Sequence, residues 1–281
     1  MKAMGPIPVG FSSDGTGSLL IGERSVSSLV NERAGTPLFA YDRDLIGRQI
    51  ARFRAAMPDN VSLHYAVKAN YYDALLIFLA QFVDGFDVAS AGEIERLAAR
   101  ISEEVGAPPA EVNLGGGFGI PYFPGELPLD VERIGAALGK AIKDTPAILN
   151  DTRFAIELGR WLVGEAGVYL TRIVDRKESG GRIFLITNGG LHHVLAASGN
   201  FGQLLRRNYP VAIASRFGAE PDEEVTVTGC LCTPLDLLVD QVMLPRADIG
   251  DIVAIFCAGA YGLSASPQSF LSQPPAGEML V

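Results

Sequence analysis

The chain has 281 residues, of which 48% are hydrophobic and 20% charged, so it can bury a substantial core as a globular protein. Its formal net charge of −9 argues against nucleic acid or an anionic membrane as the main partner. Three cysteines are too few for a disulfide framework. The N-terminus lacks the apolar stretch of a signal peptide, and the longest apolar run, residues 74–83, is too short to span a membrane. These features predict a cytoplasmic protein.

The first half of the chain alternates predicted strands and helices. PLFAY, residues 37–41, predicts a strand, and Asp42 is a suitable N-cap for the helix after it. The stretch VSLHYAVK, residues 61–68, alternates apolar and polar side chains with the period of two that is typical of a strand. The apolar residues 74–83 then predict a second helix.

The same alternation continues beyond this helix. GFDVAS, residues 85–90, predicts a short strand, and Ser90 and Glu93 have the spacing of a capping box, which favours a helix-capping role for Glu93. The next predicted elements are a strand that ends in a glycine loop, a helix and a strand: residues 110–119, 131–143 and 153–161. Strands that alternate with helices predict parallel βαβ units.

From about residue 165 the predicted elements are mostly strands. Residues 166–190 predict two strands around the turn Ser179-Gly180-Gly181, and three more β-rich segments follow: EVTVTGCLC, LDLLVDQVML and DIVAIFCAGAY. We therefore expect a mostly antiparallel β domain over residues 165–281, onto which residues 1–35 pack.

Five features with chemical potential lie at the C-terminal ends of predicted strands or in loops, where α/β barrels and open α/β sheets bind their ligands. They are Lys68, Asp87, Gly115–Gly117, the pair Glu157 and Arg160, and Tyr261. Each has a plainer explanation when taken alone. A lysine at a strand end is usually a solvated charge, a glycine run is usually a turn, an acid and an arginine three residues apart can form a local ion pair, and an aspartate can face a helix N-terminus.

Together these residue types match the needs of one cofactor, pyridoxal phosphate. A lysine amine can form an imine with the cofactor, glycine backbone amides and an arginine can hold a phosphate, and a carboxylate can keep a pyridine nitrogen protonated. Lys68, Gly115–Gly117, Arg160 and Glu157 supply these groups.

Six segments of the sequence also resemble a known family. YAVKAN, GFDVASAGE, NLGGGFG, ELGRW, GCLCTPLD and GAYG occur in the order found in fold type III pyridoxal-phosphate decarboxylases, which include the ornithine, arginine and diaminopimelate enzymes. The resemblance runs from about Thr36 to the C-terminus, and the ending FLSQPPAGEMLV is similar to a bacterial subgroup associated with exosortase systems. The resemblance implies an α/β fold, with an alanine-racemase-like (β/α) barrel in residues 36–164 and the β domain after it.

The resemblance also implies a role for each candidate residue. Lys68 would carry the imine and Glu157 would face the pyridine nitrogen. Cys232 would return a proton to the substrate in the partner subunit's site, so the family resemblance implies a homodimer. The phosphate would be surrounded by Gly115, Gly116, Gly117, Arg160 and Tyr261. Independently of the resemblance, the position of Asp87 at a strand end makes it a candidate to orient the cofactor or the substrate.

The barrel is shorter than the resemblance requires. Only 28 residues separate Asp87 from Gly115, which is room for about one βα unit of roughly 30 residues. The family has several more units between the corresponding motifs, and no histidine lies in this interval to stack on a cofactor ring. We therefore expect an incomplete barrel with open edges.

Two alternatives to decarboxylation remain open. Alanine racemases share the barrel-plus-β-domain plan and a similar lysine strand, although the glycine loop and the Cys232 segment favour decarboxylation. A non-catalytic protein that binds pyridoxal phosphate, or a remnant that binds nothing, would explain the short barrel. The substrate is also open, because Thr233 stands where diamino-acid decarboxylases carry an acid, and Arg206 and Arg207 can be either carboxylate ligands or a solvated basic pair.

Overall fold

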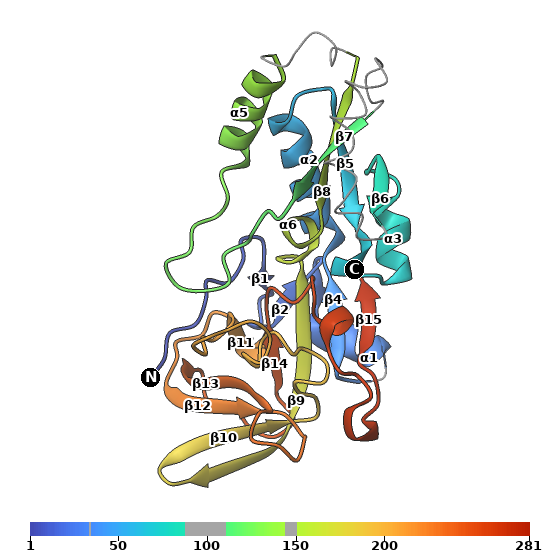
Figure 1. Ribbon diagram of the computed structural model, residues 1–281. Coiled ribbons are helices and arrows are strands. Elements are labelled where there is room, and N and C mark those ends of the chain that lie inside the picture. Colours follow the sequence, from blue (N-terminus) through green and yellow to red (C-terminus); the bar gives the residue numbers. More distant parts are fainter. Residues whose placement is uncertain (34, 88–110, 144–150) are drawn as a thin grey trace.

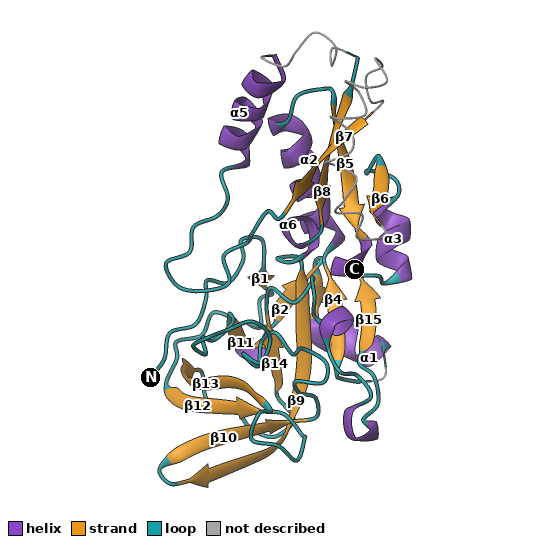
Figure 2. Ribbon diagram, in the orientation of Figure 1, coloured by secondary structure: helices purple, strands orange, loops and turns teal. Residues whose placement is uncertain are grey.

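The computed structural model describes residues 1–33, 35–87, 111–143 and 151–281, and these residues contain three β-sheets (Figure 1). A small parallel sheet with helices beside it lies at one end of the molecule, and a large, mostly antiparallel sheet lies at the other (Figure 2). The architecture is the α/β barrel-like unit plus β domain that the sequence predicts.

The parallel sheet has four strands in the spatial order β6-β5-β8-β7. The strands are β5 (Val61–Ala66), β6 (Gly85–Asp87), β7 (Glu111–Gly116) and β8 (Arg153–Leu158). The helices of this unit are α2 (Arg43–Ala56), α3 (Asp73–Leu79), α5 (Val131–Lys143) and α6 (Arg160–Val163), with the 3₁₀ turn η1 (Val67–Ala69) after β5.

One face of the parallel sheet is apolar because β5 and β8 alternate in step. Leu63 is paired with Ile156 and Tyr65 with Leu158, and all four side chains are buried in the main hydrophobic core. Helix α2 packs its own apolar stripe into this core and begins at Asp42, whose Oδ1 accepts hydrogen bonds from the amides of Asp44 and Leu45 at 2.9 and 3.0 Å. Full burial of side chains of this size stabilises the fold by about 1.5–3 kcal/mol each.

The opposite face of the sheet is polar and only half-buried. Ser62, His64, Asn113 and Glu157 lie on it, and His64 is paired with Glu157 across β5 and β8. In an α/β barrel the helices pack on the outer face of the sheet, and α2 packs on the apolar face here.

The large sheet has eight strands. The main path is β11 (Val211–Ile213), β14 (Ile252–Ile255), β9 (Gly167–Ser179), β10 (Arg182–Thr187), β12 (Glu223–Thr228) and β13 (Leu237–Leu244), with β4 (Leu38–Tyr41) beside β9 and β15 (Gly277–Leu280) beside β4. Two of its pairs, β10–β12 and β4–β15, are parallel. Three 3₁₀ turns accompany it: η3 (Ala214–Arg216), η4 (Leu263–Ala265) and η5 (Phe270–Ser272).

The N-terminal segment packs on the large sheet. It contains β1 (Ser12–Ser13), β2 (Leu19–Ile21), β3 (Arg24–Ser25) and α1 (Val26–Glu32). Buried residues of β2 and α1 share a second hydrophobic cluster with residues of β4, β9 and β14. The strand β4, which the sequence analysis assigns to the barrel unit, thus hydrogen-bonds to β9 of the large sheet. The residue limits of the two domains stay a prediction.

Strands β6 and β7 are the outer strands of the parallel sheet. Although β7 follows β6 along the chain, it pairs with β8, on the far side of β5. This order fits the expectation that barrel units are missing between Asp87 and Gly115. The predicted helix with Ser90 and Glu93 lies outside the described residues.

In the described ranges, no helix combines the length and the apolar character needed to cross a lipid bilayer.

Candidate active site

The candidate residues of the barrel unit gather at the end of the parallel sheet where its strands have their C-termini. Asp87 is the last residue of β6, Gly115 and Gly116 end β7, and Glu157 lies one residue before the end of β8. The sequence predicted a strand through Lys68, but β5 ends at Ala66 and Lys68 lies in the turn η1. All of these positions are near the C-terminal ends of parallel strands, where α/β folds bind ligands.

The turn that carries Lys68 is anchored by the segment that carries Tyr261. The carbonyl of Ala69 accepts hydrogen bonds from the Tyr261 amide at 2.8 Å and from Ser264 Oγ at 3.0 Å. A Cβ on Gly159 would lie 2.6 Å from the Cβ of Ala69, so the turn also packs directly against the segment between Glu157 and Arg160. Lys68 itself is exposed, and no other described residue forms a hydrogen bond or ion pair with its amine.

Asp87 lies beside this turn at the level of Ala66, with which it is paired across β5 and β6. Its side chain is half-buried. Its role in orienting the substrate or the cofactor stays a prediction.

Glu157 is oriented by a residue that the sequence analysis did not single out. Asn113 Nδ2 donates a hydrogen bond to Glu157 Oε1, and Asn113 Oδ1 accepts one from the Gly115 amide at 2.8 Å. Asn113 thus connects the glycine loop to the carboxylate of the neighbouring strand. Its position in the segment NLGGGFG could have indicated a role at the site, but a lone asparagine before a glycine run is also typical of a turn.

Gly115 and Gly116 end β7 and Gly117 follows the strand, and two different physical reasons favour glycine at these positions. A Cβ on Gly116 would lie 1.7 Å from the carbonyl oxygen of Glu157, so only glycine allows β7 and β8 to approach this closely. Gly115 and Gly117 have φ angles of +74° and +80°, and among the described residues no atom lies within 4 Å of the place that a Cβ would take. The backbone amides of this loop are therefore accessible, which suits the binding of an anion.

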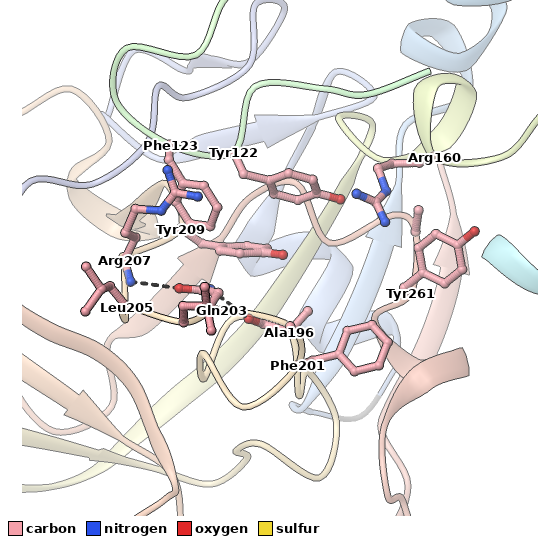
Figure 3. Close-up of a pocket in the computed structure, with 13 residues that line it drawn as sticks. Tyr122, Phe123, Arg160, Ala196, Phe201, Gln203, Leu205, Arg207, Tyr209 and Tyr261 are labelled. Atoms are coloured by element: carbon pink, nitrogen blue, oxygen red, sulfur yellow. Dashed lines mark hydrogen bonds between the residues drawn. The ribbon is translucent and has the colours of Figure 1, made fainter. Parts of the chain in front are cut away.

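Arg160 and Tyr261 line a cavity of about 730 Å³ between the parallel sheet and the β domain (Figure 3). The guanidinium carbon of Arg160 lies 5.5 Å from the ring centroid of Tyr122 and 5.2 Å from that of Tyr261, so two aromatic faces hold it by cation–π contacts. The cavity lining consists of Tyr122, Phe123, Arg160, Ala196, Phe201, Gly202, Gln203, Leu204, Leu205, Arg207, Tyr209, Ala260 and Tyr261.

The cavity has positive charge at two places. Arg207, the second arginine of its lining, lies 3.7 Å from the ring centroid of Phe123 and forms an ion pair with Glu126 at 3.2 Å. Among the described residues that line the cavity, none is an aspartate or a glutamate. Arg206, in contrast, donates hydrogen bonds to the carbonyls of Ser198 and Leu237 and serves the fold.

Two of the tyrosines that line this cavity, Tyr122 and Tyr209, were not predicted. The rings of Tyr122 and Tyr209 are 4.8 Å apart, and burial raises the pKa of both phenols. They come from segments that are distant in the sequence and have no strand or helix of their own, so no periodic pattern marks them.

Cys232 lies in the β domain, in the loop between β12 and β13. The sequence placed Cys230 and Cys232 on a strand, but β12 ends at Thr228 and both thiols are exposed in the loop. Asp236 holds this loop, because its carboxylate accepts hydrogen bonds from the amides of Leu191 and Leu231 at 2.7 and 2.8 Å. Within the described part of the chain, Cys232 is neither in contact with Lys68 nor part of the cavity lining.

Two adjacent histidines are buried beside this loop. The rings of His192 and His193 are 3.8 Å apart, and Nδ1 of His193 shares a hydrogen bond with the Tyr169 hydroxyl at 3.0 Å. Both ring nitrogens of His192 are buried without a partner among the described residues, and burial, with a smaller contribution from His193, lowers the pKa of His192 to about 4.

The buried His192 predicts an acid-sensitive fold. An unfolded histidine binds a proton near pH 6.5, whereas the folded one resists it down to pH 4, so stability should be full above pH 6.5 and fall as the pH drops toward 4. The loss attributable to this residue is at most about 3 kcal/mol. Urea unfolding of the wild type and of His192→Leu at several pH values from 4 to 8 measures this loss. The free energy of unfolding of the variant should change less with pH below 6.5, and the two proteins should show the same pH dependence between pH 7 and 8. Equal slopes below pH 6.5 would contradict the prediction.

Comparisons with known proteins agree with this architecture. Residues 33–259 match a family model described as pyridoxal-dependent decarboxylase, C-terminal sheet domain. The chain is 40% identical over 188 residues to the L-glutamyl-[BtrI acyl-carrier protein] decarboxylase of Niallia circulans, which covers 66% of this chain and 44% of that protein. It is 35% identical over 189 residues to the diaminopimelate decarboxylase of Methanothermobacter thermautotrophicus, which covers 66% of this chain and 42% of that protein.

A solved structure supports the fold. The diaminopimelate decarboxylase of M. jannaschii in complex with L-lysine aligns with a TM-score of 0.79 at 17% identity, and the alignment covers 97% of this chain and 93% of that chain. The chain spans less than half the length of the two curated relatives that it matches. It belongs to the pyridoxal-dependent decarboxylases of fold type III.

Proposed function

We propose that the chain binds pyridoxal phosphate at the C-terminal edge of the parallel sheet and decarboxylates an amino acid there. The observation that carries the proposal is the convergence of the Lys68 turn, the glycine loop, Glu157, Arg160 and Tyr261 at this edge, although they come from four separate parts of the sequence.

The residues present fit this cofactor. Gly115 and Gly117 leave open space next to backbone that can bind a phosphate, and Arg160 adds a guanidinium held between two aromatic rings. Glu157 lies next to the glycine loop, with Asn113 fixing its carboxylate, so an acid is available to a ring nitrogen. Lys68 has no competing partner among the described residues, which suits a covalent anchor.

When bound, pyridoxal phosphate supplies an electron sink for the pair of electrons left by carbon dioxide. The chain's own residues supply the rest. Lys68 would hold the cofactor through its amine. Glu157, oriented by Asn113, keeps a proton at the ring nitrogen.

Cys232 is the proposed proton donor to the carbon that loses carbon dioxide. The family resemblance implies that this cysteine serves the active site of a second subunit, and its exposed thiol on a loop of the β domain is compatible with that role. A homodimer is therefore part of the proposal. A cytoplasmic location is also proposed, because all three cysteines are free thiols, as in a reducing compartment.

The charge of the cavity bears on the substrate. The lack of an acid among the described lining residues, together with Thr233 after Cys232, disfavours a substrate with a distal amine. They favour an amino acid whose far end is uncharged or anionic. The Niallia circulans relative is named for a glutamyl group on an acyl-carrier protein, and we include such a tethered substrate in the proposal.

Absorbance and turnover of the 281-residue protein test this function. We expect a visible absorbance band that survives desalting after addition of pyridoxal phosphate. We also expect carbon dioxide release from glutamate or a carrier-bound glutamyl group that exceeds release from ornithine, lysine or diaminopimelate. Loss of optical rotation without carbon dioxide would support a racemase instead. A retained band without either reaction would support the non-catalytic alternative, and no band in folded protein would refute the site.

A further inference from the structure

The adjacent arginines Arg206 and Arg207 have different surroundings. Arg206 is partly buried and donates hydrogen bonds to the carbonyls of Ser198 and Leu237. Arg207 lines the cavity, and its side chain is half-exposed. The sequence left open whether the pair binds a carboxylate or is solvated. The structure separates the two residues: Arg206 serves the fold, and Arg207 is free to meet a ligand in the cavity.

The guanidinium of Arg207 is fixed in place but keeps unused donors. Its central carbon lies over the ring of Phe123, 3.7 Å from the centroid, and Nη1 donates a hydrogen bond to Glu126 Oε1 at 3.2 Å. The backbone amide of Arg207 donates to Gln203 Oε1 at 2.8 Å. Within the described ranges, Nε and Nη2 of Arg207 donate to no protein atom. A guanidinium that lies over a ring presents its edge to hydrogen-bond acceptors, so this edge is available.

Glu126 does not use up the binding capacity of Arg207. Its other carboxylate oxygen, Oε2, accepts hydrogen bonds from the amides of Tyr122 and Phe123 at 2.9 and 3.1 Å. These bonds order the turn that carries both rings. Glu126 therefore meets Arg207 through one oxygen and one nitrogen, and the paired donors of the guanidinium remain for a second anion.

Arg207 lies across the cavity from Arg160. Figure 3 shows the two arginines on opposite sides of the rings of Tyr122 and Tyr209. Among the described residues of the lining, these two arginines carry the positive charge. In the proposed function Arg160 binds the phosphate of the cofactor, which leaves Arg207 for the substrate.

We propose that Arg207 is a specificity-determining residue and binds a carboxylate at the far end of the substrate. The inference rests on the proposed function, which assigns Arg160 to the cofactor. It selects the anionic far end from the two kinds, uncharged or anionic, that this function allows. The free edge of a guanidinium matches the two oxygens of a carboxylate, an amide offers it one oxygen, and an amine repels it.

Calorimetric titration tests Arg207 with two probes of equal size. Glutarate ends in a second carboxylate and glutaramate in an amide, and neither has an amine that reacts with the cofactor. The wild type, with pyridoxal phosphate added, should bind glutarate about tenfold more tightly than glutaramate. Arg207→Gln should abolish this difference. The matched control, Arg182→Gln, removes an exposed arginine at the start of β10, outside the cavity lining, and should preserve it.

A second variant separates ligand binding from a structural role. Glu126→Gln keeps an acceptor oxygen for the amides of Tyr122 and Phe123 but removes the charge that competes for Arg207. It should tighten glutarate binding, which loss of a purely structural ion pair would not do. In turnover, Arg207→Gln should raise KM for L-glutamate about tenfold and leave kcat unchanged.

Several results would overturn the inference. Equal binding of glutarate and glutaramate by the wild type would do so, as would a preference that survives in Arg207→Gln or a folded protein that does not bind glutarate. If Arg207→Gln does not fold, weaker glutarate binding by Glu126→Gln refutes the inference by itself. Glutarate binding that depends on Arg207, in a protein that releases no carbon dioxide, would support this site and refute the proposed decarboxylation.

Discussion

Replacement of Lys68 by alanine should remove the visible absorbance band of the desalted protein and lower carbon dioxide release on the order of 10³-fold. Lys68 is exposed and has no partner among the described residues, so its loss should change the function without a measurable cost in stability. The ends of its turn are held by the backbone of Ala69 and by Asn70, which the substitution leaves in place.

The matched control for this prediction is Lys140→Ala, which removes an exposed lysine from α5, outside the site. It should retain both the band and the turnover. A desalted Lys68→Ala protein that keeps the full band would show that the cofactor is held elsewhere, and equal turnover would remove Lys68 from the reaction.

Gly116→Ala should be among the most damaging single substitutions in the parallel sheet. The new methyl group would lie 1.7 Å from the carbonyl oxygen of Glu157, and that atom belongs to the backbone of a central strand and has little room to move. Overpacking of this kind costs about 3 kcal/mol, and relief requires β7 to separate from β8. Because Asn113 and Glu157 face each other across this pair of strands, cofactor retention should fall together with stability.

Gly119→Ala is the control, since no atom of a described residue lies within 4 Å of the added Cβ and the backbone there has no positive φ. Urea unfolding should place this variant close to the wild type, well above Gly116→Ala. If Gly116→Ala were as stable as Gly119→Ala, the close approach of β7 and β8 would not exist in solution.

The buried face of the sheet follows from the sequence because a strand's side chains alternate. The pattern of Val61, Leu63 and Tyr65 specifies which side faces a core, and Asp42 specifies where α2 begins. The types of residue at the site could also be predicted, because an amine, a glycine loop, a carboxylate and an arginine each lie at or just after the end of a predicted strand. The residue at which β5 ends could not be predicted, because residues 67–69 continue the alternation of the strand. Only their packing against Gly159 and the Tyr261 segment bends them into a turn.

By itself, the sequence determined the parallel βαβ unit, the antiparallel β domain, the family and the candidate residues, since all of these rest on local periodicity or contiguous segments. Only the tertiary structure decided that β4 pairs with β9, that Asn113 holds Glu157, and that Tyr122 and Tyr209 line the cavity with Arg160. It also decided that β7 pairs with β8 and leaves β6 at an open edge. The physical reason is the same in each case: these contacts join segments far apart in the chain, so they depend on how whole elements pack, and no local pattern of side chains encodes them.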